Sequence, residues 1–153
     1  MKGLVVYDTT HGNTKAVAEA LSEVLRESGI DVDTVHVKDA GKPNPKEYGF
    51  LVLGSPTRFG TMSFAVKRFL GKVKADAWAD RSFAAFDTEN PENLEKNQGS
   101  AGEKIAAQLA ERGLRQAMPV LKALVLDMKG PLVEGELERV KEYGRDLAGK
   151  FKE

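Results

Sequence analysis

The chain contains no cysteine, and this absence removes several kinds of chemistry. Disulfides, thiol catalysis and cysteine-ligated iron–sulfur clusters are excluded within it. Histidine is nearly as scarce, because His11 and His36 are the only two and lie far apart in the sequence. So few ligands make a zinc site unexpected, and we predict no bound metal.

The chain also has no excess of positive or negative charge and no long apolar run. The 23 Lys and Arg residues balance the 23 Asp and Glu residues, so there is no general electrostatic reason to expect nucleic acid or a membrane surface as a partner. No segment approaches the roughly 20 apolar residues of a membrane-spanning helix. Residues 1–3 lead into a strand pattern without the features of a signal peptide. We therefore expect a cytoplasmic protein.

Apolar runs of strand length alternate with amphipathic segments of helical spacing along the chain. This alternation is typical of an α/β fold with a parallel sheet. The predicted strands cover residues 2–7, 32–37, 50–53, 82–86 and 120–126. The apolar face of the closing helix is expected to consist of Leu137, Val140, Leu147 and Phe151. We find no internal repeat and predict a single domain over residues 1–153.

A hydroxyl-rich loop joins the first strand to the first helix, and its residues are Thr9, Thr10, His11, Gly12, Asn13 and Thr14. Free N–H groups and the positive end of the helix dipole favour an anion at such a junction. The loop has neither the P-loop pattern nor the three glycines of a dinucleotide fingerprint. A plain helix cap on Asn13 or Thr14 is the alternative. Four hydroxyl or amide side chains, where one cap would suffice, favour phosphate binding, with His11 facing solvent and offering its backbone N–H.

In an open parallel sheet, ligands bind outside the carboxyl ends of the strands, where the strand order reverses. This rule selects the loops that follow Tyr7, Leu53 and Phe86. Gly54 is expected to end the third strand. The candidate residues of the second loop are Ser55, Pro56, Thr57, Arg58, Phe59 and Gly60.

The second loop has the side chains that a planar ligand requires. Phe59 offers an aromatic face, and Arg58 can donate to ring carbonyls or to a phosphate. The alternative is an ordinary strand–turn–helix connection with Ser63 as the helix cap and Arg58 in solvent. A phosphate loop on the neighbouring strand favours a ring-binding site.

The third loop has fewer side chains that are suited to binding a planar ligand. Asp87 and Thr88 are candidates for contact with the edge of a ligand, whereas the rest of the polar segment 87–100 is expected to be solvated and mobile. That segment contains no aromatic residue. Trp78 precedes the fourth strand, at the opposite end from the site, and is assigned to packing.

The chain resembles the flavodoxin family over essentially its whole length. The resemblance rests on an apolar-apolar-aromatic triplet followed by the hydroxyl-rich loop, and the matching residues are Val5, Val6, Tyr7, Thr9, Gly12, Thr14, Ala18 and Leu21. It implies a flavodoxin-like three-layer sandwich with a five-stranded parallel sheet in the order 2-1-3-4-5. It further implies non-covalent FMN, its phosphate on residues 9–14 and its isoalloxazine ring between the second and third loops.

The resemblance implies a flavoprotein that carries electrons between redox partner proteins, as a monomer or a weak homodimer, with no catalytic residue of its own. Two departures from the family pattern are the balanced charge and the missing third-loop aromatic. Residues 56–60 are also similar to the second loop of quinone reductases first described as tryptophan-repressor-binding proteins. A small NAD(P)H:quinone-type oxidoreductase is therefore the alternative. A phospho-receiver domain is rejected, because Gly54 stands where its phospho-accepting aspartate would be.

Overall fold

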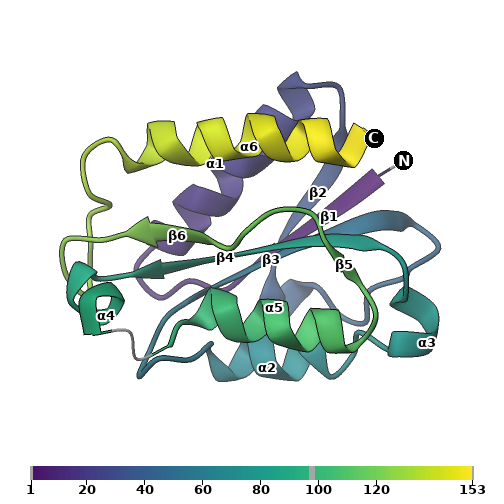
Figure 1. The fold of residues 1–153 in the computed structure, drawn as a ribbon, viewed down its shortest axis with the longest axis horizontal. Coiled ribbons are helices and arrows are strands. Elements are labelled where there is room, and N and C mark those ends of the chain that lie inside the picture. The colour runs from purple at the N-terminus through teal and green to yellow at the C-terminus, as the bar shows by residue number, and fades with distance from the viewer. Residues whose placement is uncertain (1, 97–98, 153) are drawn as a thin grey trace.

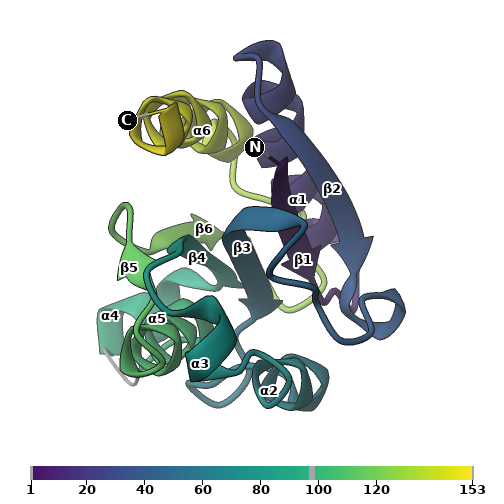
Figure 2. The same cartoon turned by 90° about the vertical axis from the view of Figure 1, so that its right-hand side faces the viewer.

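The computed structural model describes residues 2–96 and 99–152. A twisted sheet lies between two helical layers (Figures 1 and 2). The helices α1 (Asn13–Glu27) and α6 (Glu136–Lys152) cover one face. On the other face lie α2 (Phe64–Leu70) and α5 (Ala101–Glu111). The predicted three-layer α/β architecture is confirmed.

The sheet is parallel throughout its named strands. Its order is β2 (Asp31–His36), β1 (Lys2–Tyr7), β3 (Tyr48–Pro56), β4 (Ser82–Glu89), and then β5 (Arg115–Gln116), with β6 (Leu121–Leu124) also paired to β4. The predicted order 2-1-3-4-5 is confirmed. The fifth strand predicted over 120–126 corresponds to the shorter β6, and β5 before it was not predicted. Pro119 lies between them, and a proline has no N–H to give to a strand ladder.

The prediction that Gly54 ends the third strand is wrong. β3 continues to Pro56, and Gly54 pairs with Phe86 of β4. A Cβ on Gly54 would lie 2.1 Å from the Phe86 ring. Glycine is therefore present because an aromatic ring packs over the strand, not because the strand stops.

The prediction of a solvated segment beyond Thr88 is wrong for Glu89 and Ser100, which are buried, whereas most of residues 91–96 are exposed as predicted. Asp87, Thr88 and Glu89 are buried residues at the end of β4. They are followed by α4 (Pro91–Lys96), which the sequence reading missed along with α3 (Ala75–Trp78) and a 3₁₀ turn over Val37–Asp39. The part of the prediction that concerns residues 97–98 lies outside the described residues.

Two apolar cores fill the space between the layers. Trp78 is buried in the core on the α2 and α5 side, which confirms its assignment to packing. Val140 and Leu147 of α6 are buried in the other core, whereas Leu137 is exposed and its predicted place on the apolar face is wrong. Among the described residues, no helix combines the length and the apolar character that crossing a membrane requires.

Candidate functional site

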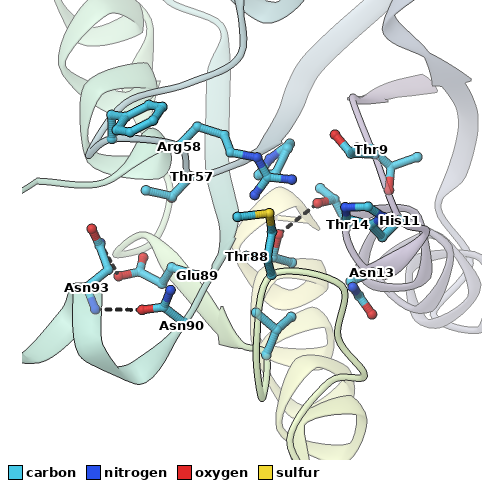
Figure 3. A pocket seen from close by; sticks show the side chains of 15 residues that line it. Thr9, His11, Asn13, Thr14, Thr57, Arg58, Thr88, Glu89, Asn90 and Asn93 are labelled. Atoms are coloured by element: carbon cyan, nitrogen blue, oxygen red, sulfur yellow. Dashed lines mark hydrogen bonds between the residues drawn. The ribbon is translucent and has the colours of Figure 1, made fainter.

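A cavity of about 170 Å³ lies at the carboxyl end of the sheet, where β1, β3 and β4 end (Figure 3). Its walls come from the first loop, the turn after β3, the end of β4, α4 and the segment after β6. The lining residues are Thr9, Thr10, His11, Asn13, Thr14, Pro56, Thr57, Arg58, Phe59, Thr88, Glu89, Asn90, Asn93, Val125 and Met128. Three loops far apart in the sequence therefore meet at one cavity, as the switch-point rule predicts.

The first loop is folded by its own hydrogen bonds. Thr9 Oγ1 accepts the Gly12 N–H at 2.9 Å, and Gly12 adopts a φ of +90°, a conformation that favours glycine. Helix α1 begins directly after it and has no side-chain cap. The alternative that Asn13 or Thr14 caps the helix is therefore wrong, and the first-turn N–H groups of α1 are left for another acceptor.

Asn13 and Thr14 instead connect the loop to other parts of the cavity. The Asn13 side-chain amide donates to the carbonyl of Lys129 at 3.1 Å. The hydroxyls of Thr14 and Thr88 lie 2.8 Å apart in a buried hydrogen bond, which Figure 3 marks with a dashed line. These contacts hold the start of α1 against β4 and against the segment after β6.

The second loop is a tight turn that presents one aromatic ring. Arg58 and Thr61 exchange two backbone hydrogen bonds of 3.0 Å, and Phe59 between them has a φ of +52° and a fully exposed side chain. A non-glycine residue at positive φ is uncommon and carries strain. The turn therefore holds an apolar ring at the cavity mouth, where a planar ligand can cover it.

Arg58 is half-buried at the cavity wall rather than free in solvent. Among the described lining residues it is the only lysine or arginine. Ser63 does cap α2, as the alternative reading of this loop predicted, because its hydroxyl accepts the Val66 N–H at 3.3 Å. A capped helix therefore follows the loop, and the turn before it lines a cavity, while ring binding by this loop stays a prediction.

Four predicted site residues do not line the cavity: Gly12, Ser55, Gly60 and Asp87. Ser55 is occupied within the protein, because its hydroxyl accepts the Ser63 N–H at 2.9 Å and donates to the carbonyl of Pro56 at 2.9 Å. Gly12 and Gly60 shape their turns through positive φ angles of +90° and +74°. These residues position the walls of the cavity.

Asp87 is buried behind the wall, where Oδ2 accepts the Gly102 N–H at 2.8 Å. Burial, followed by the neighbouring carboxyl of Glu89, raises the pKa of Asp87 to about 8. The Gly102 N–H and the Ser100 hydroxyl act in the opposite direction. A carboxyl with this pKa keeps its proton at neutral pH.

Five lining residues were missed from the sequence: Glu89, Asn90, Asn93, Val125 and Met128. The last two follow the final strand, so the rule on carboxyl ends of strands already pointed to them. Glu89 and Asn90 directly follow the predicted Thr88. Asn93 could be predicted as a lining residue only together with helix α4, because this helix places it at the cavity.

The lining residues suit an anionic group joined to a planar ring. Threonine hydroxyls and the uncapped start of α1 can hold a phosphate without a lysine. The Phe59 ring and the Arg58 guanidinium line the cavity from the second loop. Asn90 and Asn93 add amide groups from the third side.

Comparisons with known proteins identify the family of this chain. Residues 4–122 match the model of a family described as a flavodoxin domain. A flavodoxin of Aquifex aeolicus is 41% identical over 80 residues, which cover 52% of this chain and 43% of that protein. A protoporphyrinogen IX dehydrogenase [quinone] of Escherichia coli is 32% identical over 72 residues, covering 47% of this chain and 40% of that protein. The chain thus spans less than half the length of these curated relatives.

Solved structures show the same fold over the whole chain. A flavodoxin from the domain Archaea superimposes with a TM-score of 0.84 at 29% identity, with 100% of both chains covered. Oxidised Flavodoxin 1 from Bacillus cereus gives a TM-score of 0.80 at 18% identity, covering 97% of this chain and 98% of the other, which supports the fold alone. From the matched domain, the shared topology and the loop that opens α1, we conclude that this chain belongs to the flavodoxin family.

Proposed function

We propose that this chain binds FMN non-covalently and carries electrons between redox partner proteins. The observation that carries the proposal is the uncapped start of α1, enclosed with a threonine-rich loop in a cavity at the carboxyl end of a flavodoxin-family sheet. The names of two relatives, both flavodoxins, support the same function.

The phosphate of FMN is assigned to the first loop. Its oxygens would accept hydrogen bonds from the first-turn N–H groups of α1, with the hydroxyls of Thr9 and Thr10 and the Asn13 side chain around them. The helix dipole adds to the attraction within the first turn. No lysine lines this part of the described cavity, so the binding energy rests on oriented N–H and O–H donors.

The ring of FMN is assigned to the space between the second and third loops. Phe59 supplies an aromatic surface, and Arg58 supplies a donor for ring oxygens or nitrogens. FMN would supply the electron-transfer chemistry, while the protein sets its position and electrostatic surroundings. The exposed side chains of Phe59 and Met128 at the cavity leave an apolar edge where a redox partner protein can approach.

The second candidate function is an FMN-dependent NAD(P)H:quinone-type oxidoreductase. It is favoured by the third side of the cavity, where Glu89, Asn90 and Asn93 stand and no described residue of α4 is aromatic. A ring face without an aromatic cover admits a small substrate. The names of two relatives, the E. coli dehydrogenase [quinone] and an NAD(P)H dehydrogenase (quinone) of Cupriavidus metallidurans, also favour this alternative.

Rapid mixing of the FMN-loaded protein with NADPH or NADH distinguishes the two functions. We expect a carrier to keep its flavin absorbance with either nucleotide and to lose it with a chemical reductant. Rapid bleaching by NADPH or NADH, followed by recovery on adding a quinone, would assign the oxidoreductase function instead. The chemical reductant serves as the control that the bound flavin is redox-active.

A further inference from the structure

The end of β4 carries two carboxyl side chains that the proposed function does not use. Asp87 and Glu89 are two residues apart on one strand, so their side chains leave it on the same side. Asp87 is 0% exposed and Glu89 is 3% exposed. Two buried, ionised carboxylates side by side would repel each other and lose their hydration, which makes a doubly charged state costly.

The hydrogen bonds of this carboxyl pair leave one carboxyl oxygen of each residue without a partner in the described part of the chain. Asp87 Oδ2 accepts the Gly102 N–H at 2.8 Å, and Glu89 Oε1 accepts the Asn93 side-chain N–H at 3.1 Å. Among the residues that the structure describes, Asp87 Oδ1 and Glu89 Oε2 are buried and have no hydrogen-bond partner. One proton between these two carboxyls would turn one acceptor into a donor and satisfy both atoms.

No ion pair with either carboxyl exists within residues 2–96 and 99–152. On β6, Lys122 is the register neighbour of Asp87, but its Nζ pairs with Glu103 of α5 at 3.4 Å. On the second loop, Arg58 lines the same cavity as Glu89. With no cation bound directly to the pair, a proton is the positive charge that neutralises it.

Other groups around the pair come from α5 and α4. The Ser100 hydroxyl at the start of α5 and the Gly102 N–H favour an ionised Asp87, yet the pKa of Asp87 is still raised. Lys104 of α5 extends toward Gly99, since a Cβ on Gly99 would lie 3.8 Å from its Nζ. Asn93 of α4 is neutral, so it orients Glu89 without changing the net charge of the pair.

The pair lies at the wall of the proposed FMN cavity. Glu89 lines the cavity itself, and Thr88 between the two carboxyls bonds to Thr14 of the first loop. We propose that Asp87 and Glu89 share one proton, and that loss of this proton at alkaline pH adds a negative charge beside the cavity and weakens the binding of FMN. The second half of this proposal rests on the proposed function, whereas the shared proton does not.

Carboxyl carbon NMR of the ligand-free protein tests the shared proton. We expect one carboxyl of the wild type to titrate with a pKa of about 8 and the Asp87→Asn variant to lose this transition. The asparagine mimics the protonated pair, because its oxygen can accept from Gly102 and its amide can donate to Glu89. A wild type whose carboxyls all titrate in the ordinary acidic range would overturn the proposal.

The dissociation constant of FMN, measured at pH 7 and pH 9.5, tests the coupling. The wild-type value should rise roughly fivefold relative to Asp87→Asn, the order expected for one added charge about 10 Å away at an effective dielectric constant of about 20 with screening by salt. The control variant is Glu95→Gln at an exposed position, and its dissociation constant for FMN should change with pH as that of the wild type does.

These outcomes separate the two proposals. If FMN binds to none of the proteins, the proposed function fails while the NMR titration still decides the shared proton. If FMN binds with the same pH dependence in the wild type and in Asp87→Asn, the coupling is refuted although FMN binding stands.

Discussion

Replacing Thr10 with aspartate is expected to weaken FMN binding roughly a hundredfold, the order that Coulomb's law gives for a new carboxylate near a phosphate dianion. Thr10 is exposed and lines the cavity in the loop that opens α1. The fold should tolerate the change, because a negative charge near a helix N-terminus is favourable. The measurement is a titration of FMN fluorescence quenching, with thermal unfolding of the ligand-free protein recorded alongside.

The matched control is Thr10→Asn, which has nearly the same size and no charge. It should lower the affinity only slightly, since an amide can replace the hydroxyl donor. High salt should recover part of the loss in the aspartate variant and little in the asparagine variant. Equal affinities for the two variants would show that the phosphate does not lie at this loop.

Replacing Gly54 with alanine is expected to lower the free energy of unfolding by about 3 kcal/mol, as overpacking of a filled core does. The added Cβ would lie 2.1 Å from the Phe86 ring, which is itself 1% exposed and has little space into which to move. Moving that ring disturbs the core between β4 and helix α1. Denaturant unfolding, with the midpoint and the slope both fitted, measures the effect.

Gly149→Ala is the control for this prediction. Gly149 is an exposed residue of α6, and a Cβ there meets nothing within 4 Å. Alanine in a helix is favoured over glycine by about 1 kcal/mol, so this variant should gain stability. A Gly54→Ala protein as stable as the wild type would mean that the Phe86 ring does not press on β3.

Most of the sheet could be predicted because its strands are short apolar runs between helices of regular spacing. The strand order came from the family resemblance and was confirmed. Gly54 was misread because a glycine that ends a strand and a glycine that makes room for a ring look the same in sequence. The split of the last strand around Pro119 depends on where β4 runs beside it, which local sequence does not show.

The sequence around α4 carries a local signal for a helix start. Pro91 stands at the first helical position, and Asn90 before it accepts the Asn93 N–H at 2.7 Å as a cap would. Glu92 and Lys96 form an ion pair of 2.6 Å at the spacing of one helical turn. These residues predict a short helix, yet the polar composition of the segment was taken as evidence for a solvated loop.

The candidate site could be predicted as three loops but not in its details. Thr14 was predicted as a hydroxyl donor to a phosphate, with a helix cap as the alternative, whereas its hydroxyl bonds to Thr88, which lies 74 residues away in the sequence. Asp87 was predicted to contact the ligand, whereas the approach of α5 buries it behind the cavity wall. Gly102 permits this approach because a Cβ there would lie 2.9 Å from Asp87 Oδ2. Tertiary packing decides both cases, and no local pattern reports it.

The most direct test of the central claim is the flavin content of the purified protein. The protein is denatured, the released chromophore is identified by chromatography against FMN, and its amount is compared with the protein concentration. We predict a yellow protein that releases one FMN per chain, or a colourless protein that takes up added FMN to the same ratio. A colourless protein that does not bind added FMN would contradict the account.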